Sequence, residues 1–352
     1  MNTDKYKTPD GGFKSFGEFL AKVRRVCDNE TTDNRLVPAR KTTGHLEIGD
    51  DSLGGYLVPE QYEREIYESM KLGGAVVRPR ALVIPTISDV VDLPMLNDSN
   101  RATNTYGGIS FNWTAEAAQM SGSSSVSAPA IVQRSMTVHK LTAGCYVSNE
   151  LEDDHGAFGA VMKAAFGRAL SFIEDDYFFQ GTGVGQPMGA INSGVVISQD
   201  RATASALEWQ DIVNMAKRLL PASWPNAAWY INPDTLDEIM DTAGTANQAG
   251  RLNLGELKLL GLPIIPTEHC SAMGTFGDIF LADWSHYVIA DRSLEIAGSR
   301  HTNNSNVGFI SGETYWRVIQ RVGGQPTTDA AITPKRGANT VSPFVAISTD
   351  TS

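Results

Sequence analysis

The segment from about Thr86 to Ala130 constrains the fold of this chain more than any other. It is long, it gives few strong helix signals, and it ends in the serine-rich MSGSSSVSAPA. Loops of this length are rare inside compact domains and usually mark a functional projection or disorder. Strand-like residues in VVDLPML and ISFNWTAEA predict a long two-stranded hairpin. Because an isolated hairpin is only marginally stable in water, we expect this one to lie against another subunit.

An amphipathic helix is predicted in the N-terminal region. In FKSFGEFLAKVRRVC, apolar side chains that include Phe13, Phe16, Leu20 and Val23 recur every three to four residues and form one stripe. A helix of this length is marginal in water, so the stripe must dock on the chain's own body or on a neighbouring chain. The flanking sequence shows no such period, and we interpret residues 1–55 as an extended arm that carries this helix.

Two further helices are predicted in the body of the protein. GGYLVPEQYEREIYESMKLGG places Pro59 in a first turn and aligns three apolar residues on one face. After the strand-like IVQRSMTVHKLTAGCYVS, Ser148 is expected to cap a helix that runs to about Phe179. Such a helix spans roughly 45 Å at 1.5 Å per residue. We expect it to be the spine of the fold.

The C-terminal half alternates helix and strand signals. WQDIVNMAKRLLP and PDTLDEIMDTAG predict helices, and AAWYINP, GLPIIPT, GDIFLADWSHYVIAD and LEIAG predict strands. These pieces indicate a compact α/β unit over residues 195–320. FISGETYWRVIQRVGG and the terminal TVSPFVAIS also predict strands, which we expect to return to the region of the spine helix.

Composition excludes several classes of protein. The 352 residues, 41% hydrophobic and 20% charged, are typical of a soluble globular protein. The formal net charge of −11 argues against tight, sequence-independent DNA binding, which depends on Lys and Arg. The three cysteines are far apart and predict reduced thiols in a cytoplasm. No apolar run approaches the ~20 residues of a membrane span, and the polar start does not resemble a signal peptide.

The stretch FFQGTGVGQPMGAI carries Gly181, Gly183, Gly185 and Gly189 and raises the question of a phosphate-binding loop. Such a loop lies between a strand and a helix and is followed by Lys with Ser or Thr. Here a predicted helix precedes the glycines, and no Lys-Ser or Lys-Thr pair follows them. We therefore interpret the glycines as a structural corner, where they end a helix and allow tight turns.

No other motif gives a strong enzyme signal. Gly-x-Ser-x-Gly and His-Glu-x-x-His do not occur. The run from Glu152 to His155 is a poor metal site, because consecutive residues on a helix point in different directions, and acidic residues suit a helix start. His269 and Cys270 are neighbours in a predicted strand, so they face opposite ways and do not form a nucleophilic pair. Trp113 is expected to be a packing anchor, since no basic groove accompanies it.

Taken in order, these pieces resemble the major capsid protein of tailed double-stranded DNA bacteriophages, the fold named after phage Hong Kong ninety-seven. The resemblance rests on GGYLVPEQYEREIYESM, on Trp113 to Glu116 in the hairpin, on KLTAGCYVSNELEDD, and above all on DDYFFQGTGVGQPMGAINSG. It runs from about residue 54 to 348. In the last of these stretches the residues that fall in the family's positions are Asp176, Phe179, Gly183, Pro187 and Gly189.

The resemblance implies an α+β phage major capsid fold in six parts. In sequence order these are an N-terminal arm with an amphipathic helix (1–55), the start of the peripheral domain (56–83), an extended β-hairpin loop (84–133), the peripheral domain with its spine helix (134–194), an α/β axial domain (195–320) and return strands of the peripheral domain (321–352).

The resemblance also implies a structural protein, not an enzyme, whose hexamers and pentamers assemble into an icosahedral shell around a double-stranded DNA genome. The expected partners are other copies of the chain, a portal protein and loosely held packaged DNA, with separate scaffolding and decoration proteins left open and with no membrane and no cofactor. The expected location is the virion, and the host cytoplasm during assembly. Two alternatives remain: an encapsulin-like bacterial nanocompartment shell, and an α/β enzyme that uses residues 195–320 as its catalytic domain.

Some members of the family that this sequence resembles crosslink the subunits of their shells. An isopeptide bond forms between a loop lysine and an asparagine of a neighbouring subunit, with a glutamate as base. In this sequence the extended loop from Leu82 to Gln133 contains no lysine. Asn339 is available as the asparagine, but no glutamate follows Glu313. The sequence therefore predicts a shell held together by noncovalent contacts.

Overall fold

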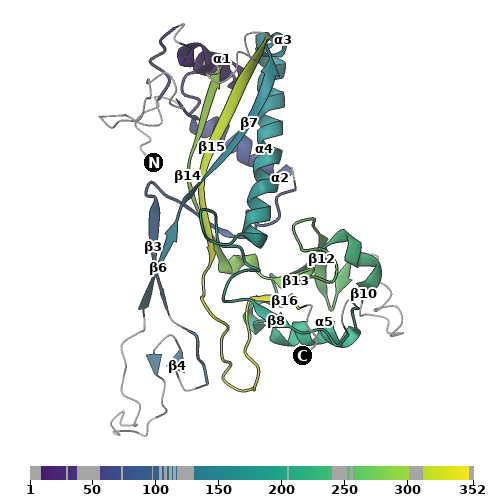
Figure 1. Ribbon diagram of the computed structural model, residues 1–352. Helices are drawn as coiled ribbons and strands as arrows, with labels where there is room; N and C mark the ends of the chain where they lie inside the picture. Colours follow the sequence, from purple (N-terminus) through teal and green to yellow (C-terminus); the bar gives the residue numbers. More distant parts are fainter. Residues whose placement is uncertain are drawn as a thin grey trace.

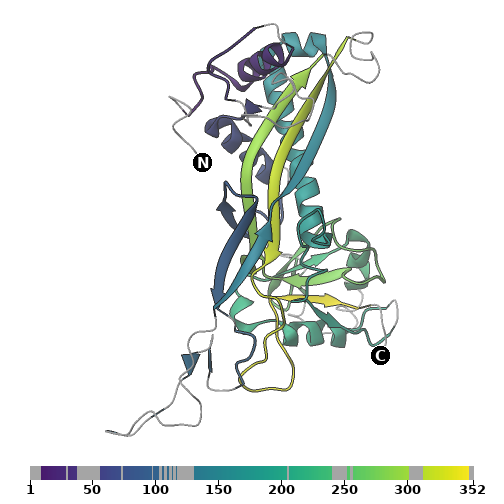
Figure 2. The same cartoon turned by 60° about the vertical axis from the view of Figure 1, so that its left-hand side comes forward.

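The computed structural model describes two units, a long sheet flanked by helices and a smaller α/β unit at one end (Figure 1). A two-stranded hairpin projects from the long sheet, on the side toward the α/β unit (Figure 2). The described residues are 9–28, 31–37, 56–72, 74–96, 98–102, 105–106, 109–110, 113, 116, 131–203, 206–239, 252–253, 257–300 and 312–348.

The long sheet joins strands that are far apart in the sequence. Its order is β1-β14-β15-β7, and β2 pairs in parallel with β14. Three of the strands have 10 to 14 residues, against a usual five or six, so the sheet is as long as the helix beside it. The bounds are β1 (Tyr56–Leu57), β2 (Leu82–Pro85), β7 (His139–Ser148), β14 (Tyr287–Ser299) and β15 (Glu313–Pro326).

Four helices of the described chain belong to this unit: α1 (Phe16–Cys27), α2 (Glu60–Leu72), α3 (Asn149–Asp153) and α4 (His155–Gln180). The longest, α4, lies along the sheet (Figure 1). Its Phe158, Met162, Phe166 and Leu170 are buried in one cluster with residues of α1, α2 and the sheet. None of the helices in the described ranges combines the length and apolar character needed to cross a membrane.

The spine is two helices rather than the single helix that the sequence predicts. α3 follows Ser148 and ends at Asp153, and α4 begins at His155. Between them, the Asp154 carboxylate accepts a hydrogen bond from the Ala157 amide at 3.3 Å. Aspartate competes for backbone donors and favours N-cap positions, so it starts a new helix here.

The α/β unit is a seven-stranded sheet in the order β10-β11-β12-β9-β13-β16-β8, with α5 (Trp209–Arg218) packed on it. The side chains of β9, β13 and β16 are all buried. The predicted helix PDTLDEIMDTAG is helical to Ile239, and its remainder lies outside the described residues. The strands are β8 (Ile197–Gln199), β9 (Ala228–Ile231), β10 (Leu252–Asn253), β11 (Lys258–Leu259), β12 (Leu262–Pro266), β13 (Ile279–Ala282) and β16 (Phe344–Ile347).

The strand pairing corrects the division predicted for the C-terminal half. The sequence pattern places β14 and the first part of β15 in the α/β unit at 195–320, but both are central strands of the long sheet. It places β16 among return strands at 321–352, but β16 lies between β13 and β8 in the α/β unit. Strand patterns do not encode partners, because pairing depends on the tertiary context of each strand. The chain therefore crosses between the units three times, after α4, after β13 and after β15.

The projecting hairpin pairs β3 (Val90–Leu96) with β6 (Ile131–Thr137) over their whole length. The predicted partner for VVDLPML, ISFNWTAEA, is wrong: its first two residues form β5 (Ile109–Ser110), which pairs with β4 (Thr105–Tyr106). The predicted strand IVQRSMTVHKLTAGCYVS is two strands, β6 in the hairpin and β7 in the long sheet. The hairpin thus continues directly into the sheet that carries it.

The glycine-rich loop forms a tight corner after α4. Gly183 and Gly185 have φ values of +78° and +70°, which side chains other than glycine rarely adopt. Gly181 has an ordinary φ of −58°, but a Cβ there would overlap the carbonyl oxygens of Pro187 and Tyr177. Each glycine is therefore required for its own reason, either backbone conformation or close packing.

We expect the two kinds of glycine to respond differently to alanine. Gly185→Ala has open space around the new methyl group, so strain at positive φ should lower the free energy of unfolding by about 1 kcal/mol. Gly181→Ala forces backbone apart and should lower it by roughly 3 kcal/mol or more. Chemical denaturation of both variants measures the difference. Saturable binding of ATP or GTP that is lost in either variant would overturn the interpretation as a corner.

Candidate assembly surfaces and the junction between the units

The N-terminal helix α1 docks on the chain's own body. Ser15 caps it by accepting a hydrogen bond from the Glu18 amide at 3.2 Å. The four residues named above from its predicted apolar stripe are all buried in the main core cluster: Phe13, Phe16, Leu20 and Val23. A Cβ on Gly159 of α4 would lie only 2.6 Å from the Gly17 nitrogen, so the two helices meet at paired glycines. The sequence left open whether this stripe docks on its own chain or on a neighbour, and the structure selects its own chain.

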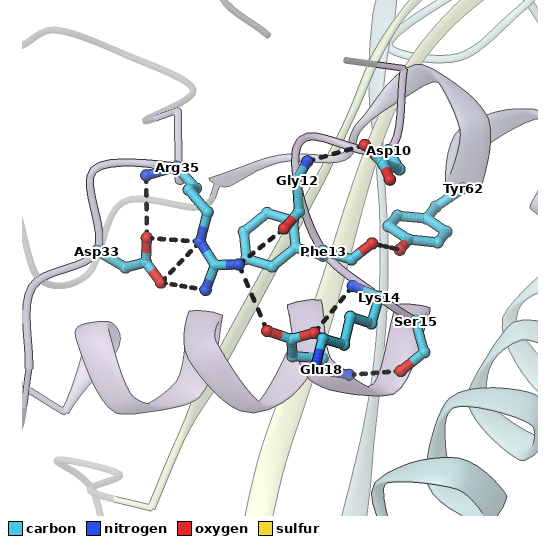
Figure 3. Close-up of polar contacts among 9 residues, drawn as sticks. All are labelled: Asp10, Gly12, Phe13, Lys14, Ser15, Glu18, Asp33, Arg35 and Tyr62. Atoms are coloured by element: carbon cyan, nitrogen blue, oxygen red, sulfur yellow. Dashed lines mark hydrogen bonds and ion pairs between the residues drawn. The ribbon is translucent and has the colours of Figure 1, made fainter. Parts of the chain in front are cut away.

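A second element holds the start of α1 in place (Figure 3). The Arg35 guanidinium pairs with Asp33 at 2.8 Å and donates to the Gly12 carbonyl, also at 2.8 Å. It also lies 4.3 Å from the centroid of the Phe13 ring. On the other side, the Tyr62 hydroxyl of α2 donates to the Phe13 carbonyl at 3.0 Å. The residues before α1 are therefore bound to the segment after it and to α2.

The acidic run after β7 serves the same docking. Glu152 is buried and forms ion pairs with Arg24 of α1 and with Arg300, and it accepts a hydrogen bond from the Thr314 hydroxyl at 2.8 Å. Asp154 caps α4. Across the described residues, no group of three or more His, Cys, Asp or Glu side chains is arranged to hold a metal ion. Glu152 thus binds cations of its own chain.

The strongest charged cluster lies where the extended loop leaves the long sheet. Arg78 binds Glu174 of α4 through two hydrogen bonds of 2.9 and 2.6 Å, and its third nitrogen binds Asp291 of β14 at 2.6 Å. Gln320 of β15 donates to the same Glu174 at 2.7 Å. The next carboxylate, Asp175, accepts from two backbone amides of the segment before Arg78. Helix, sheet and loop root are joined at one point, which we call the Arg78 cluster.

Sequence reasoning missed the Arg78 cluster. Its members are separated by 96 and 213 positions, so no local pattern connects them. The one available signal was a run of three carboxylates, Glu174 to Asp176, in a largely apolar part of the spine helix; the first two of them are buried. Buried carboxylates of this kind need partners, but the sequence does not say which.

Burial shapes the protonation of this region. Burial alone would lower the pKa of Arg78, but the charges of Glu174 and Asp291 raise it well above its ordinary value. Burial raises the pKa of Glu63, on α2, to about 7, and the nearby charges of Asp291 and Glu60 add to the shift. The Tyr67 hydroxyl and the Arg78 charge oppose it only in part. Burial also raises the pKa of Asp175 to about 6.

The hairpin presents apolar side chains to solvent. Ile87 and Ile131 are 68% and 64% exposed, and Val90 is also exposed. Trp113 is fully exposed, so the prediction that it anchors packing fails within the single chain. Glu116, next to it in the predicted motif, is exposed as well. The hairpin and its root therefore present apolar side chains that a second molecule could cover.

The two residues considered as a nucleophilic pair do not form one. Burial raises the pKa of the Cys270 thiol, which makes a thiolate unfavourable. His269 lies between the rings of Phe172 and Phe179, and its Nδ1 is 3.7 Å from an Asp176 carboxylate oxygen. Burial lowers the pKa of His269. Both residues belong to the contact between α4 and the α/β unit.

Comparisons with known proteins agree with this architecture. The model of the phage capsid family matches residues 54–336. Among solved structures, the capsid of a native GTA particle has a TM-score of 0.58 and 17% identity, covering 78% of this chain and 89% of that one. A structure from Microbacterium phage Oxtober96 has a TM-score of 0.55 and 11% identity, covering 78% of this chain and 91% of that one. A structure from Mycobacterium phage Bobi has a TM-score of 0.53 and 15% identity, covering 79% of this chain and 91% of that one. No curated protein matches the sequence.

These findings define a shell-forming structural protein with the fold of tailed-phage capsids. The family match covers most of the chain, so this protein belongs to the phage capsid family. The resemblance drawn from the sequence motifs is confirmed, and so is the expected α+β capsid fold. The long sheet with α4, the hairpin and the α/β unit are the parts of that fold visible in this chain.

The contact between Gly17 of α1 and Gly159 of α4 allows a test of docking, because the sign of the stability change caused by Gly159→Ala depends on whether α1 is packed there. Gly159→Ala should gain about 1 kcal/mol of helix propensity but lose more by forcing the helices apart, for a net loss of roughly 1 to 2 kcal/mol. Thermal and urea unfolding of the full chain measure the net effect. The matched control is the same substitution in a chain that lacks residues 1–28, where it should be stabilising. A stabilising effect in the full chain would show that α1 does not dock on α4.

Glu63 should make stability fall with rising pH. Its folded-state pKa of about 7 lies above the ordinary value of 4.5, so the folded protein binds the extra proton. The contribution is full below about pH 4.5 and is lost as the pH rises through 7. Glu63→Gln should therefore raise the free energy of unfolding at pH 8 by roughly 2 kcal/mol and flatten its decline between pH 5 and 8. Asp175 contributes with the same sign, so some slope should remain.

Urea unfolding at several pH values measures this slope. Glu68→Gln, an exposed carboxylate on the same helix, is the matched control and should leave the slope as in the wild type. If Glu63→Gln destabilises the protein at pH 8, the charged form of Glu63 is favourable in the fold and our assignment of its environment is wrong.

Proposed function

We propose that this chain is the major capsid protein of a tailed bacteriophage and that its copies assemble into a closed icosahedral shell around double-stranded DNA. Membership of the phage capsid family supports this assignment. The observation that carries it is the hairpin, a long projection with exposed apolar side chains that its own chain does not cover.

The exposed hairpin needs a partner for a physical reason. Two strands alone do not make a stable unit in water. Exposure of apolar side chains such as Ile87 and Ile131 to water is also unfavourable. Burial of each on another subunit contributes roughly 1.5 to 3 kcal/mol. A shell repeats that contact at every subunit, so modest contacts add up to a stable particle. Hexamers and pentamers of the chain, with the α/β unit near their axes, are the arrangement we propose.

Charge and chemistry fit a container rather than an enzyme. The net charge of −11 disfavours tight binding of packaged DNA, so we propose only loose contact with the genome. A portal protein, and separate scaffolding or decoration proteins, are the further partners we propose. The protein would act in the virion after assembly in the host cytoplasm. No catalytic role is proposed, because the buried Cys270 and the corner glycines have structural contacts.

Electron microscopy of the expressed protein tests this proposal. We expect closed, regular shells, and native particles should contain double-stranded DNA that a nuclease degrades only after the shell is opened. The control is Ile87→Asp with Ile131→Asp, which places charges on the hairpin surface and should leave folded subunits that do not close shells. Particles filled with a protein cargo and free of DNA would instead support the nanocompartment. Folded monomers with no shells under any condition would contradict both.

The shell should contain no covalent bonds between subunits. Crosslinking by a lysine needs the free amine and a nearby base, since the amine is protonated at its ordinary pKa of about 10.4. The loop from Leu82 to Gln133 has no lysine, and no glutamate follows Glu313. Mature particles boiled in detergent with reductant should run as one band near 38.0 kDa. A ladder of larger species that survives this treatment would disprove the prediction.

A further inference from the structure

The hairpin is attached to its own chain at both ends. At its root, the Thr86 amide donates to the Asp291 carbonyl of β14 at 2.7 Å, and the Val138 amide donates to the Asp89 carbonyl at 2.9 Å. The Asp89 carboxylate also forms an ion pair with Arg292 of β14. These bonds join the root to the long sheet. A projection held only there would move with the long sheet alone.

The far end of the hairpin is held by a different segment, residues 327–334, which we call the strap. The Thr333 amide donates to the Ser99 carbonyl, and the Arg101 amide donates to the Thr333 carbonyl, both at 2.9 Å. Arg134 of β6 forms an ion pair with Asp329 of the strap. Backbone bonds and a charge pair therefore connect both sides of the hairpin to the strap.

The strap follows β15 of the long sheet directly, and its later part is bonded to the α/β unit. Ile332 and Val341 exchange two backbone hydrogen bonds of 2.8 Å, and their side chains are buried with Leu220 in a small cluster. The next residue, Ser342, bonds through its backbone to Arg218 and Leu220, at the end of α5, at 2.9 Å each. The far end of the hairpin is thus tied to the α/β unit, and its root is tied to the long sheet.

The contact between the hairpin and the strap is loosely packed and open to solvent. A cavity of 330 Å³ lies between them, lined by residues that include Met95, Val132 and Ile332. The Asp329 side chain is 77% exposed, so its ion pair with Arg134 is reachable by water. Few buried apolar contacts and solvent-accessible polar bonds are the marks of a segment that opens at low free energy. The contact between the strap and the hairpin is therefore expected to open at low free energy.

We propose that the strap is a clasp that couples the orientation of the α/β unit to the direction of the hairpin. When the α/β unit shifts relative to the long sheet, the strap carries the far end of the hairpin with it, and when the clasp opens, the hairpin turns about its root. Its use in assembly rests on the proposed function: contacts of the α/β unit around a capsomer would then set where the hairpin meets its neighbour. The coupling itself is a property of the single chain.

Hydrogen exchange of unassembled, full-length protein tests the clasp. Val341→Ala removes packing beneath the strap, at a residue that is not on the hairpin. We expect amide exchange in residues 98–102 to rise about tenfold, with the long sheet unchanged. Asp329→Ala, which breaks the ion pair, should raise the same exchange while leaving the amides of residues 341 and 342 protected. Ile279→Val, in another core cluster of the α/β unit, is the control and should leave the hairpin unchanged.

Two results would overturn the clasp. One is unchanged exchange at residues 98–102 in both variants, which would mean that the strap does not restrain the hairpin. The other is a uniform rise across the long sheet as well, which would mean that the variants merely destabilise the fold. Because the measurement uses free subunits, it does not depend on whether shells form. Failure of the shell experiment would therefore leave this result intact, and the reverse also holds.

Discussion

The buried Arg78 cluster is the interaction on which the arrangement of this subunit depends. One guanidinium binds carboxylates of the spine helix and of β14, and Gln320 adds β15 to the same network. A buried charge without its partner is strongly unfavourable, so the cluster favours the arrangement of loop root, helix and sheet in which Arg78 pairs with both carboxylates. The extended loop begins a few residues later, so the cluster fixes the place from which it leaves the subunit.

The subunit covers most of its own apolar surface but not all of it. The N-terminal helix, which in isolation would be unstable, is absorbed into the core by Phe13, Phe16 and its neighbours. The hairpin buries Met136 against the long sheet but leaves other apolar side chains, such as Val90 and Ile131, exposed. This contrast separates a segment that completes the fold of its own chain from one whose exposed apolar side chains are, under the proposed function, available to a neighbouring chain.

The sequence motifs that suggest a ligand or catalytic site all have structural roles in the fold. The glycine-rich loop is a corner, with positive φ at Gly183 and Gly185. The acidic run supplies Glu152 to Arg24 and Asp154 to a helix start. His269 lies between aromatic rings at the contact of the two units. Motifs that suggest a ligand site when seen in isolation are satisfied here by the chain's own groups.

Local periodicity was enough to predict α1, α2, α4, α5 and most individual strands, because an amphipathic stripe or an alternating pattern depends only on nearby residues. The capsid resemblance and the absence of loop lysines were also readable from the sequence. Strand partners were not: β14, β15 and β16 look alike locally but belong to different sheets. The Arg78 cluster and the strap were likewise decided by tertiary structure. Each of them depends on groups that are brought together from distant positions, and a one-dimensional pattern carries no information about which of those groups will meet.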